Sequence, residues 1–184
     1  MTTRARHARD RRSTLVPSPR TAAGRAAPDA RPAVRPLDPA DLHWMQECRR
    51  HLHGPDTDLD DLDQLSAVFD RYAAAWHATE PALRWDPRPT TTAAGIAVGD
   101  LVVRRAPGAH WVAVAGTRDL ALAHPDTTAL ELPLQAVSAA WVAGRQGALP
   151  ELVDELVERT ARRAASAHEP ALLSGALRLL SLRR

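Results

Sequence analysis

Apolar residues recur at intervals of three and four along much of this chain of 184 residues, which is the spacing of one face of a helix. The clearest stripe runs from Leu62 through Phe69 to Trp76, behind a run of aspartates that suits a helix N-terminus. An earlier helix is expected to start at Asp38, a good capping residue, with Pro39 in its first turn. The pattern predicts helices over residues 38–53, 58–80, 93–105, 134–143, 151–168 and 171–184.

Between the third and fourth of these helices, the apolar pattern changes to that of extended chain. Strands are expected at 110–116, 120–123 and 129–134, separated by short turns that contain Gly116 and Pro125. Consecutive strands with short turns pair as an antiparallel meander. The sequence therefore predicts an α+β fold, in which helices pack on a three-stranded antiparallel β-meander.

Two glycines, Gly95 and Gly99, stand four residues apart in the third predicted helix, just before Asp100. A phosphate-binding loop of the P-loop type needs a lysine, and the chain has none; a dinucleotide-binding loop needs a preceding strand. Each glycine costs a helix about 1 kcal/mol relative to alanine, so we expect close packing to compensate. We therefore interpret both glycines as sites where a neighbouring element approaches the helix.

Positive charge is concentrated at one end of the chain. Residues 1–37 hold nine arginines and two acids, a net charge of +7, whereas the remainder has a net charge of −5. This first segment is rich in arginine, proline and alanine and has no hydrophobic period, so we expect it to be disordered. The predicted organisation is a tail over 1–37, a single α+β domain over 38–168 and a basic, leucine-rich C-terminal helix over 169–184.

The single cysteine, Cys48, excludes an intramolecular disulfide and is typical of a reducing compartment. No segment reaches the roughly 20 apolar residues that a membrane-spanning helix needs. The arginine pair at 11–12 is not followed by the apolar region of an export signal. The sequence predicts a cytoplasmic protein without a membrane span.

The best candidates for metal ligands are Cys48 and three nearby histidines, His43, His51 and His53. No Cys-x-x-Cys motif accompanies them, and on a helix His51 and His53 point in different directions, so we assign them to a helix end. The acidic run that begins at Asp56 lacks the glycine and the glutamate that a calcium loop requires. We predict no metal and no cofactor.

Three polar residues flank the second predicted strand, Arg118 and Asp119 before it and His124 after it. They are candidates to line a pocket, but no further catalytic group accompanies them and no Gly-x-Ser-x-Gly motif is present. We interpret them as turn formers and surface ion pairs and predict no catalytic residue. The five tryptophans are assigned to the hydrophobic core, because only Trp111 lies on a predicted strand and a base-stacking sheet needs several.

Several short motifs follow one another along the middle of the chain. They are Gly95–Asp100, Gly108–Val112, Arg118–Thr127 and Pro133–Ser138. Together they resemble a bacterial domain-of-unknown-function family, DUF3806, over residues 58–156. Leu132 departs from that family, which has an aromatic residue before the proline. The resemblance implies an α+β fold and brings no activity with it.

The sequence thus favours a small protein-interaction or accessory domain without catalytic activity. The alternative is an enzyme or a small-ligand-binding module that uses Arg118, Asp119 and His124 at the edge of the sheet. Nucleic-acid association through the basic tail is a further alternative, which the acidic remainder of the chain disfavours. The leucines of residues 169–184 must be covered by the domain itself, an anionic membrane surface, a protein partner or a second copy, and we expect the C-terminal helix to mediate such contacts.

Overall fold

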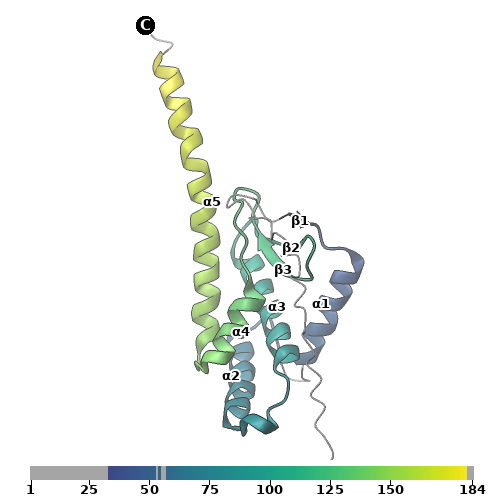
Figure 1. Cartoon of the computed structure of the whole chain (residues 1–184). Coiled ribbons are helices and arrows are strands. Elements are labelled where there is room, and N and C mark those ends of the chain that lie inside the picture. The colour runs from purple at the N-terminus through teal and green to yellow at the C-terminus, as the bar shows by residue number, and fades with distance from the viewer. Residues whose placement is uncertain (1–32, 53, 55–56, 182–184) are drawn as a thin grey trace, which may run out of the picture. The chain divides into compact units, whose positions relative to one another are not determined.

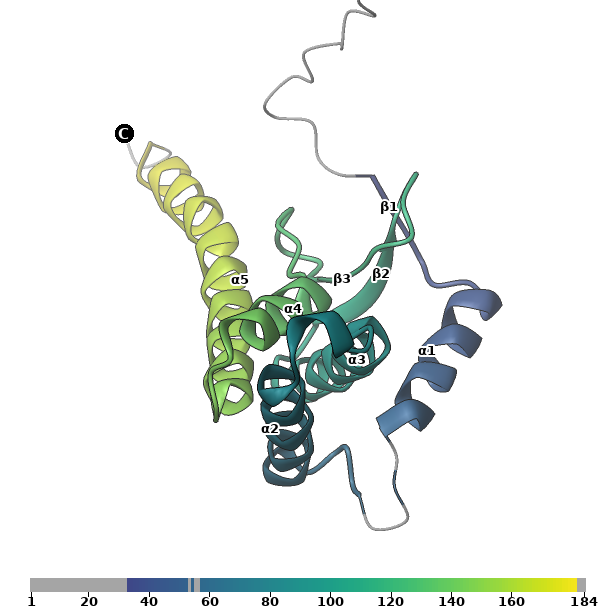
Figure 2. The same ribbon diagram turned by 60° about the horizontal axis from the view of Figure 1, so that its bottom comes forward.

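The computed structural model describes the backbone of residues 33–52, 54 and 57–181, and the side chains of these residues up to 166. The described chain forms an α+β fold with a three-stranded antiparallel sheet, as the sequence predicts (Figures 1 and 2). The elements are β1 (Val34–Arg35), α1 (Pro39–Leu52), α2 (Leu62–Ala78), the short 3-10 helix η1 (Pro81–Leu83), α3 (Arg88–Arg105), β2 (His110–Val114), β3 (Leu120–Ala123), α4 (Pro133–Ala143) and α5 (Ala148–Ser181). None of the described helices is long and apolar enough to cross a membrane.

The third strand of the sheet is not the predicted one. The order is β1-β2-β3, and β1 pairs antiparallel with β2 so that Val34 faces Val114. The segment predicted as a strand over 129–134 makes only one bridge, in which the backbones of Glu131 and Leu122 exchange hydrogen bonds of 2.8 and 3.0 Å. Pairing stops there because Pro133 has no N–H to donate and is the first residue of α4.

The predicted disordered tail is therefore too long by several residues. Residues 33–37 belong to the folded domain: the carbonyl of Ala33 accepts a hydrogen bond of 2.8 Å from the N–H of Ala115, and Leu37 packs against a small core cluster. Strand β1 could not be predicted from the sequence, because it has only two residues and lies in an arginine- and proline-rich stretch without a hydrophobic period. The rest of the predicted tail, residues 1–32, lies outside the described residues.

Helix α3 is the centre of the fold. It contacts α1, α2, α4, α5 and β2 (Figure 2). Its residues 93–99 are all buried, so the helix has no solvent face over this stretch. A helix that is apolar all round belongs in a core. It begins at Arg88 with Pro89 in its first turn, earlier than predicted, because a proline is readily accommodated there.

The two glycines of α3 are where its neighbours come closest, as the sequence predicts. A Cβ atom on Gly95 would lie 2.7 Å from the Cα of Leu134 in α4, and one on Gly99 would lie 2.1 Å from Cζ2 of Trp111 in β2. Both distances are far below a carbon–carbon contact. A larger residue has to displace the backbone of α4 at Gly95 and the Trp111 ring at Gly99.

The prediction that all the tryptophans are core residues holds only in part. Trp141 of α4 is fully buried, with its ring centroid 5.5 Å from that of Phe69 and 6.0 Å from that of Trp76, both in α2. By contrast, Trp44 and Trp85 are 42% and 40% exposed. A sequence pattern does not reveal that these two tryptophans lie at the surface.

Helix α5 replaces the two helices predicted over 151–168 and 171–184. Its backbone is helical from Ala148 to Ser181, through Pro170. A proline within a helix costs about 3 kcal/mol, but the residues on both sides are rich in alanine, leucine and arginine, which favour the helix. Of the α5 side chains that the structure describes, those of residues 148–166, the buried ones lie in the first four turns: they are Ala148, Leu149, Val153, Leu156 and Thr160.

Candidate functional site

The structure does not bring the three predicted edge residues together. Arg118 and Asp119 lie in the turn between β2 and β3, whereas His124 follows the other end of β3. Arg118 lines a surface cavity, and His124 lies beside a different and very small one. An extended strand separates residues at its two ends, so the predicted edge does not form a single site.

His124 has a structural position. It is 9% exposed, its Nε2 lies 3.0 Å from the carbonyl oxygen of Pro107, and its Nδ1 accepts a hydrogen bond of 3.3 Å from the N–H of Asp126. This arrangement fits a neutral ring that donates from Nε2. Gly108 has a φ of 88°, and a Cβ there would lie 2.6 Å from His124 Nε2. The ring thus joins two loops, and both of its nitrogens are engaged.

The cavity beside Arg118 has a volume of about 580 Å³ and lies between β1, α1 and the β2–β3 turn. Arg35 and Asp41 form one wall, Trp44 and Arg118 contribute further lining, and Leu120 is its buried apolar residue. These residues come from segments that are more than seventy positions apart in the sequence, so only the folded sheet assembles the cavity. We refer to it as the β1–α1 cavity.

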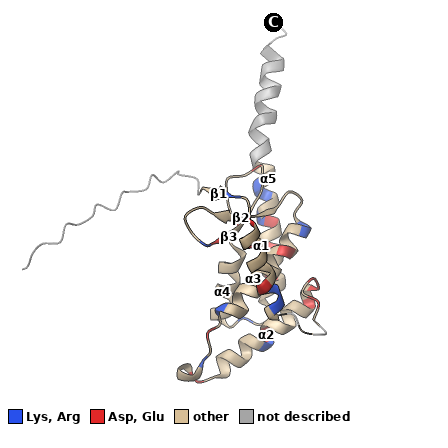
Figure 3. Cartoon of the chain, turned by 90° about the vertical axis from the view of Figure 1, so that its right-hand side faces the viewer, with Lys and Arg blue, Asp and Glu red and all other residues tan. Residues whose placement is uncertain are grey.

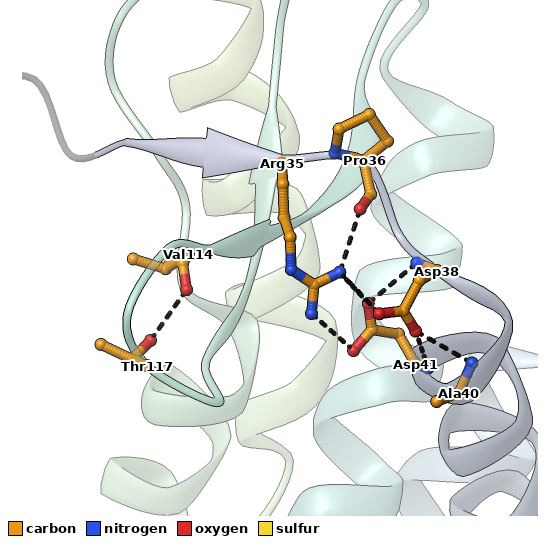
Figure 4. A network of polar contacts seen from close by, with 7 residues as sticks. All are labelled: Arg35, Pro36, Asp38, Ala40, Asp41, Val114 and Thr117. Atoms are coloured by element: carbon orange, nitrogen blue, oxygen red, sulfur yellow. Dashed lines mark hydrogen bonds and ion pairs between the residues drawn. The ribbon is translucent and has the colours of Figure 1, made fainter.

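Most polar groups of this cavity are already paired with one another (Figure 4). Arg35 donates to both carboxylate oxygens of Asp41, at 2.5 and 3.2 Å, and to the carbonyl of Pro36 at 3.1 Å. Asp38 caps α1, since its Oδ1 accepts hydrogen bonds of 2.9 Å from the N–H groups of Ala40 and Asp41. The hydrogen bonds from Arg35 hold the pKa of Asp41 below its usual value, so this carboxylate is ionised at neutral pH.

The turn at the other side of the cavity is also internally satisfied. The Thr117 hydroxyl donates to the carbonyl of Val114 at 3.2 Å and accepts from the N–H of Asp119 at 3.0 Å. Gly116 has a φ of 78°, which the turn requires. Arg118 differs from all these groups, because its guanidinium has no hydrogen bond or ion pair with any described residue.

A second polar cluster, which the sequence did not predict, joins α1, α3 and β2. Arg49 donates to both oxygens of Asp100, at 2.7 and 2.9 Å, and the indole N–H of Trp111 donates to Asp100 Oδ1 at 3.0 Å. Asp100 directly follows Gly99, whose surface the Trp111 ring covers. The Gly-Asp pair and the later tryptophan were visible in the sequence, but nothing local indicated their arginine partner.

A third cluster fixes α5 to the sheet. Glu131 is buried and forms ion pairs with Arg159, at 3.2 Å, and with Arg163. Burial raises the pKa of Glu131, and the two guanidinium groups oppose that rise. A further hollow, of about 430 Å³ between α4 and α5, is lined mainly by alanines, and Arg145 and Glu151 at its rim are paired at 2.5 Å. These groups are occupied in holding the fold.

The candidate metal ligands do not form a cluster among the described residues. Cys48 is half-buried and packs against the core, which raises the pKa of its thiol, whereas His43 and His51 are exposed and His53 lies outside the described residues. In the acidic run, Asp61 caps α2 by accepting hydrogen bonds from the N–H groups of residues 63 and 64. The acids thus mark a helix N-terminus, as predicted.

Arginines and acids are interspersed along the described elements in the view of Figure 3. Several of them form ion pairs between helices and loops, such as Arg104 with Asp60 at 2.7 Å. Comparison of the chain with family models, with curated proteins and with solved structures found no match. The resemblance to DUF3806 therefore stays a prediction.

Proposed function

We propose that this protein is a non-catalytic interaction domain that contacts a protein partner, or a second copy of itself, through the C-terminal part of α5. One observation carries the proposal. After Thr160 none of the described side chains of α5 is buried, yet its backbone stays helical to Ser181. The helix thus continues for 21 residues beyond Thr160, and the side chains described among them, those of residues 161–166, are not buried.

A helical segment of this length needs a source of stability. Isolated helices of this length are marginal in water, and most helices in proteins are stabilised by packing an apolar face. The sequence of the segment supplies the material for such a face: residues 172–180 include five leucines. Their side chains lie outside those described, so the assignment of a partner to them rests on the sequence and on the course of the backbone.

The cytoplasm is the compartment that we propose. The chain has a single cysteine, which is half-buried, and burial raises the pKa of its thiol. A non-catalytic role agrees with the engagement of the candidate edge, where both ring nitrogens of His124 are committed to the backbone.

The test uses the full chain and a variant with Leu173→Gln and Leu180→Gln. Leu83→Gln is the matched control, because Leu83 is 72% exposed on η1, away from α5 in the sequence. Sedimentation velocity of the purified proteins shows whether the chain self-associates. If it is a monomer, affinity capture from the native lysate is repeated with all three proteins.

We expect the double variant to lose self-association, or to lose a captured protein that the wild type and Leu83→Gln retain, with an unchanged circular dichroism spectrum. Identical sedimentation and identical capture for all three proteins would overturn the proposal. Flotation of the wild type with anionic liposomes, abolished in the double variant, would assign the segment to a membrane surface and would equally contradict a protein partner.

A further inference from the structure

The β1–α1 cavity contains two large groups that no described part of the protein uses, the guanidinium of Arg118 and the exposed indole of Trp44. We propose that the cavity binds a small aromatic carboxylate, whose anion pairs with Arg118 and whose ring packs on Trp44. This inference is independent of the function proposed for α5, because the cavity is lined by other elements.

The two arginines and two aspartates that line the cavity differ in how they are paired. Arg35 is neutralised by Asp41, and Asp38 uses its Oδ1 to cap α1 and lies 3.3 Å from Arg35 through Oδ2. Arg118 is left as the cation without a partner among the described residues. A guanidinium presents parallel N–H donors that match the two oxygens of a carboxylate. A phosphate monoester carries more negative charge and would meet the carboxylates of Asp38 and Asp41 as well.

The apolar part of the cavity selects the ring. Trp44 is 42% exposed, although the next residue, Met45, is fully buried in the core beneath α1. Leu120, 4% exposed, lines the cavity as well. An exposed indole face favours offset or edge-on contact with another aromatic ring. The Trp44 and Leu120 side chains thus provide apolar lining in the same cavity as the Arg118 guanidinium.

The size of the cavity agrees with such a ligand. Sites for small molecules are clefts of about 300–1,000 Å³ that combine apolar lining with a few polar groups. The β1–α1 cavity, at about 580 Å³, lies within this range. The other groups on its walls donate and accept among themselves, so they hold its shape without competing for the ligand.

Naphthoate is the probe, and the full-length protein is titrated with it while amide chemical shifts and calorimetric heats are recorded. We expect saturable binding with a Kd of about 1 mM or tighter, as the size of the probe permits. The shifted amides should belong to α1, β1 and the β2–β3 turn. Naphthol, which has the ring without the carboxylate, and naphthyl phosphate should both bind more weakly.

Two substitutions separate the contributions of the two groups. Arg118→Gln should weaken naphthoate binding about tenfold, the effect of losing one charge-assisted pair, and should leave naphthol unaffected. Trp44→Leu should weaken both compounds about three- to tenfold. The controls are Arg162→Gln, an exposed arginine of α5, and Trp85→Leu, a tryptophan of similar exposure; each should stay within about twofold of wild type.

The proposal is overturned if naphthoate shows no saturable binding below about 10 mM. It is also overturned if Arg118→Gln and Arg162→Gln behave alike, or if the shifted amides lie outside the cavity. Should Trp44→Leu fail to fold, the comparison of naphthoate with naphthol on the wild type and on Arg118→Gln still decides the matter.

Discussion

Replacing Gly99 by alanine should destabilise the protein, although alanine is the better helix former. The new methyl group would lie 2.1 Å from Cζ2 of Trp111, so the ring has to retreat by about 1.4 Å to reach an ordinary carbon contact. The indole N–H of Trp111 is bound to Asp100 Oδ1 at 3.0 Å, and a retreat of that size breaks the hydrogen bond. The ring thus cannot move freely.

The free energies can be compared term by term. Overpacking costs about 1–3 kcal/mol, the lost hydrogen bond to the Asp100 carboxylate costs about 1.5–3 kcal/mol, and the change from glycine to alanine in a helix returns about 1 kcal/mol. We expect Gly99→Ala to lower the free energy of unfolding by about 2–5 kcal/mol. Urea unfolding followed by far-ultraviolet circular dichroism measures this without relying on tryptophan fluorescence.

A double-mutant cycle tests the cause. In a Trp111→Val background the ring is gone, and Gly99→Ala should become stabilising by about 0.5–1 kcal/mol. Gly95→Ala is the control, since its methyl group would meet the backbone of Leu134 at 2.7 Å and should be destabilising in both backgrounds. If Gly99→Ala stabilises the wild-type protein, or if its effect is the same in both backgrounds, the close packing of α3 on Trp111 is refuted.

Two further predictions concern the segment before α1 and the N-cap of α2. Deleting residues 1–32 should leave the thermal midpoint within about 2 °C of the wild type. Deleting residues 1–37 also removes β1 and Leu37 and should lower the midpoint by about 4 °C or more. Differential scanning calorimetry of both proteins measures the difference, and equal midpoints would mean that β1 does not stabilise the fold. Asp61→Ala should lower the free energy of unfolding at neutral pH, because the helix N–H groups hold the pKa of Asp61 below its unfolded value. The difference in the free energy of unfolding from wild type should shrink as the pH falls through that lowered pKa. A difference that is constant from pH 7 to pH 2 would contradict this role.

The helices were largely predictable because their signals are local. Asp38 and Pro39 announce the start of α1 to within one residue. The stripe from Leu62 locates α2, although the helix was predicted from residue 58 and begins four residues later. The close packing at Gly95 and Gly99 was predictable for a related reason. Glycine lowers the stability of a helix, so two glycines in one helix indicate that a neighbouring element packs closely there. The prediction ended a helix before Pro170, whereas the backbone of α5 is helical on both sides of it. Whether a helix continues through a proline depends on the stability of the flanking segments, which the proline itself does not indicate.

The sheet and the cavity depend on contacts that the sequence does not encode locally. Val34 and Arg35 look like part of a charged tail, and only the free edge of β2 makes them a strand. Arg118 was singled out from its turn, but it was grouped with His124, which an intervening strand places elsewhere. Trp44 was assigned to the core because hydrophobicity alone does not tell which side of a helix a neighbour covers.

One short segment, residues 33–37, connects the sheet with the cavity. It supplies the edge strand that pairs with β2, and it supplies Arg35, whose ion pair with Asp41 builds the cavity wall. A ligand that binds only the assembled cavity stabilises the docked segment by RT ln(1 + [L]/Kd), which is about 2.7 kcal/mol at a hundredfold excess over Kd. The same linkage runs in reverse, because loss of β1 removes the wall and with it the affinity. The order of this segment and the occupancy of the cavity are therefore two measures of one equilibrium.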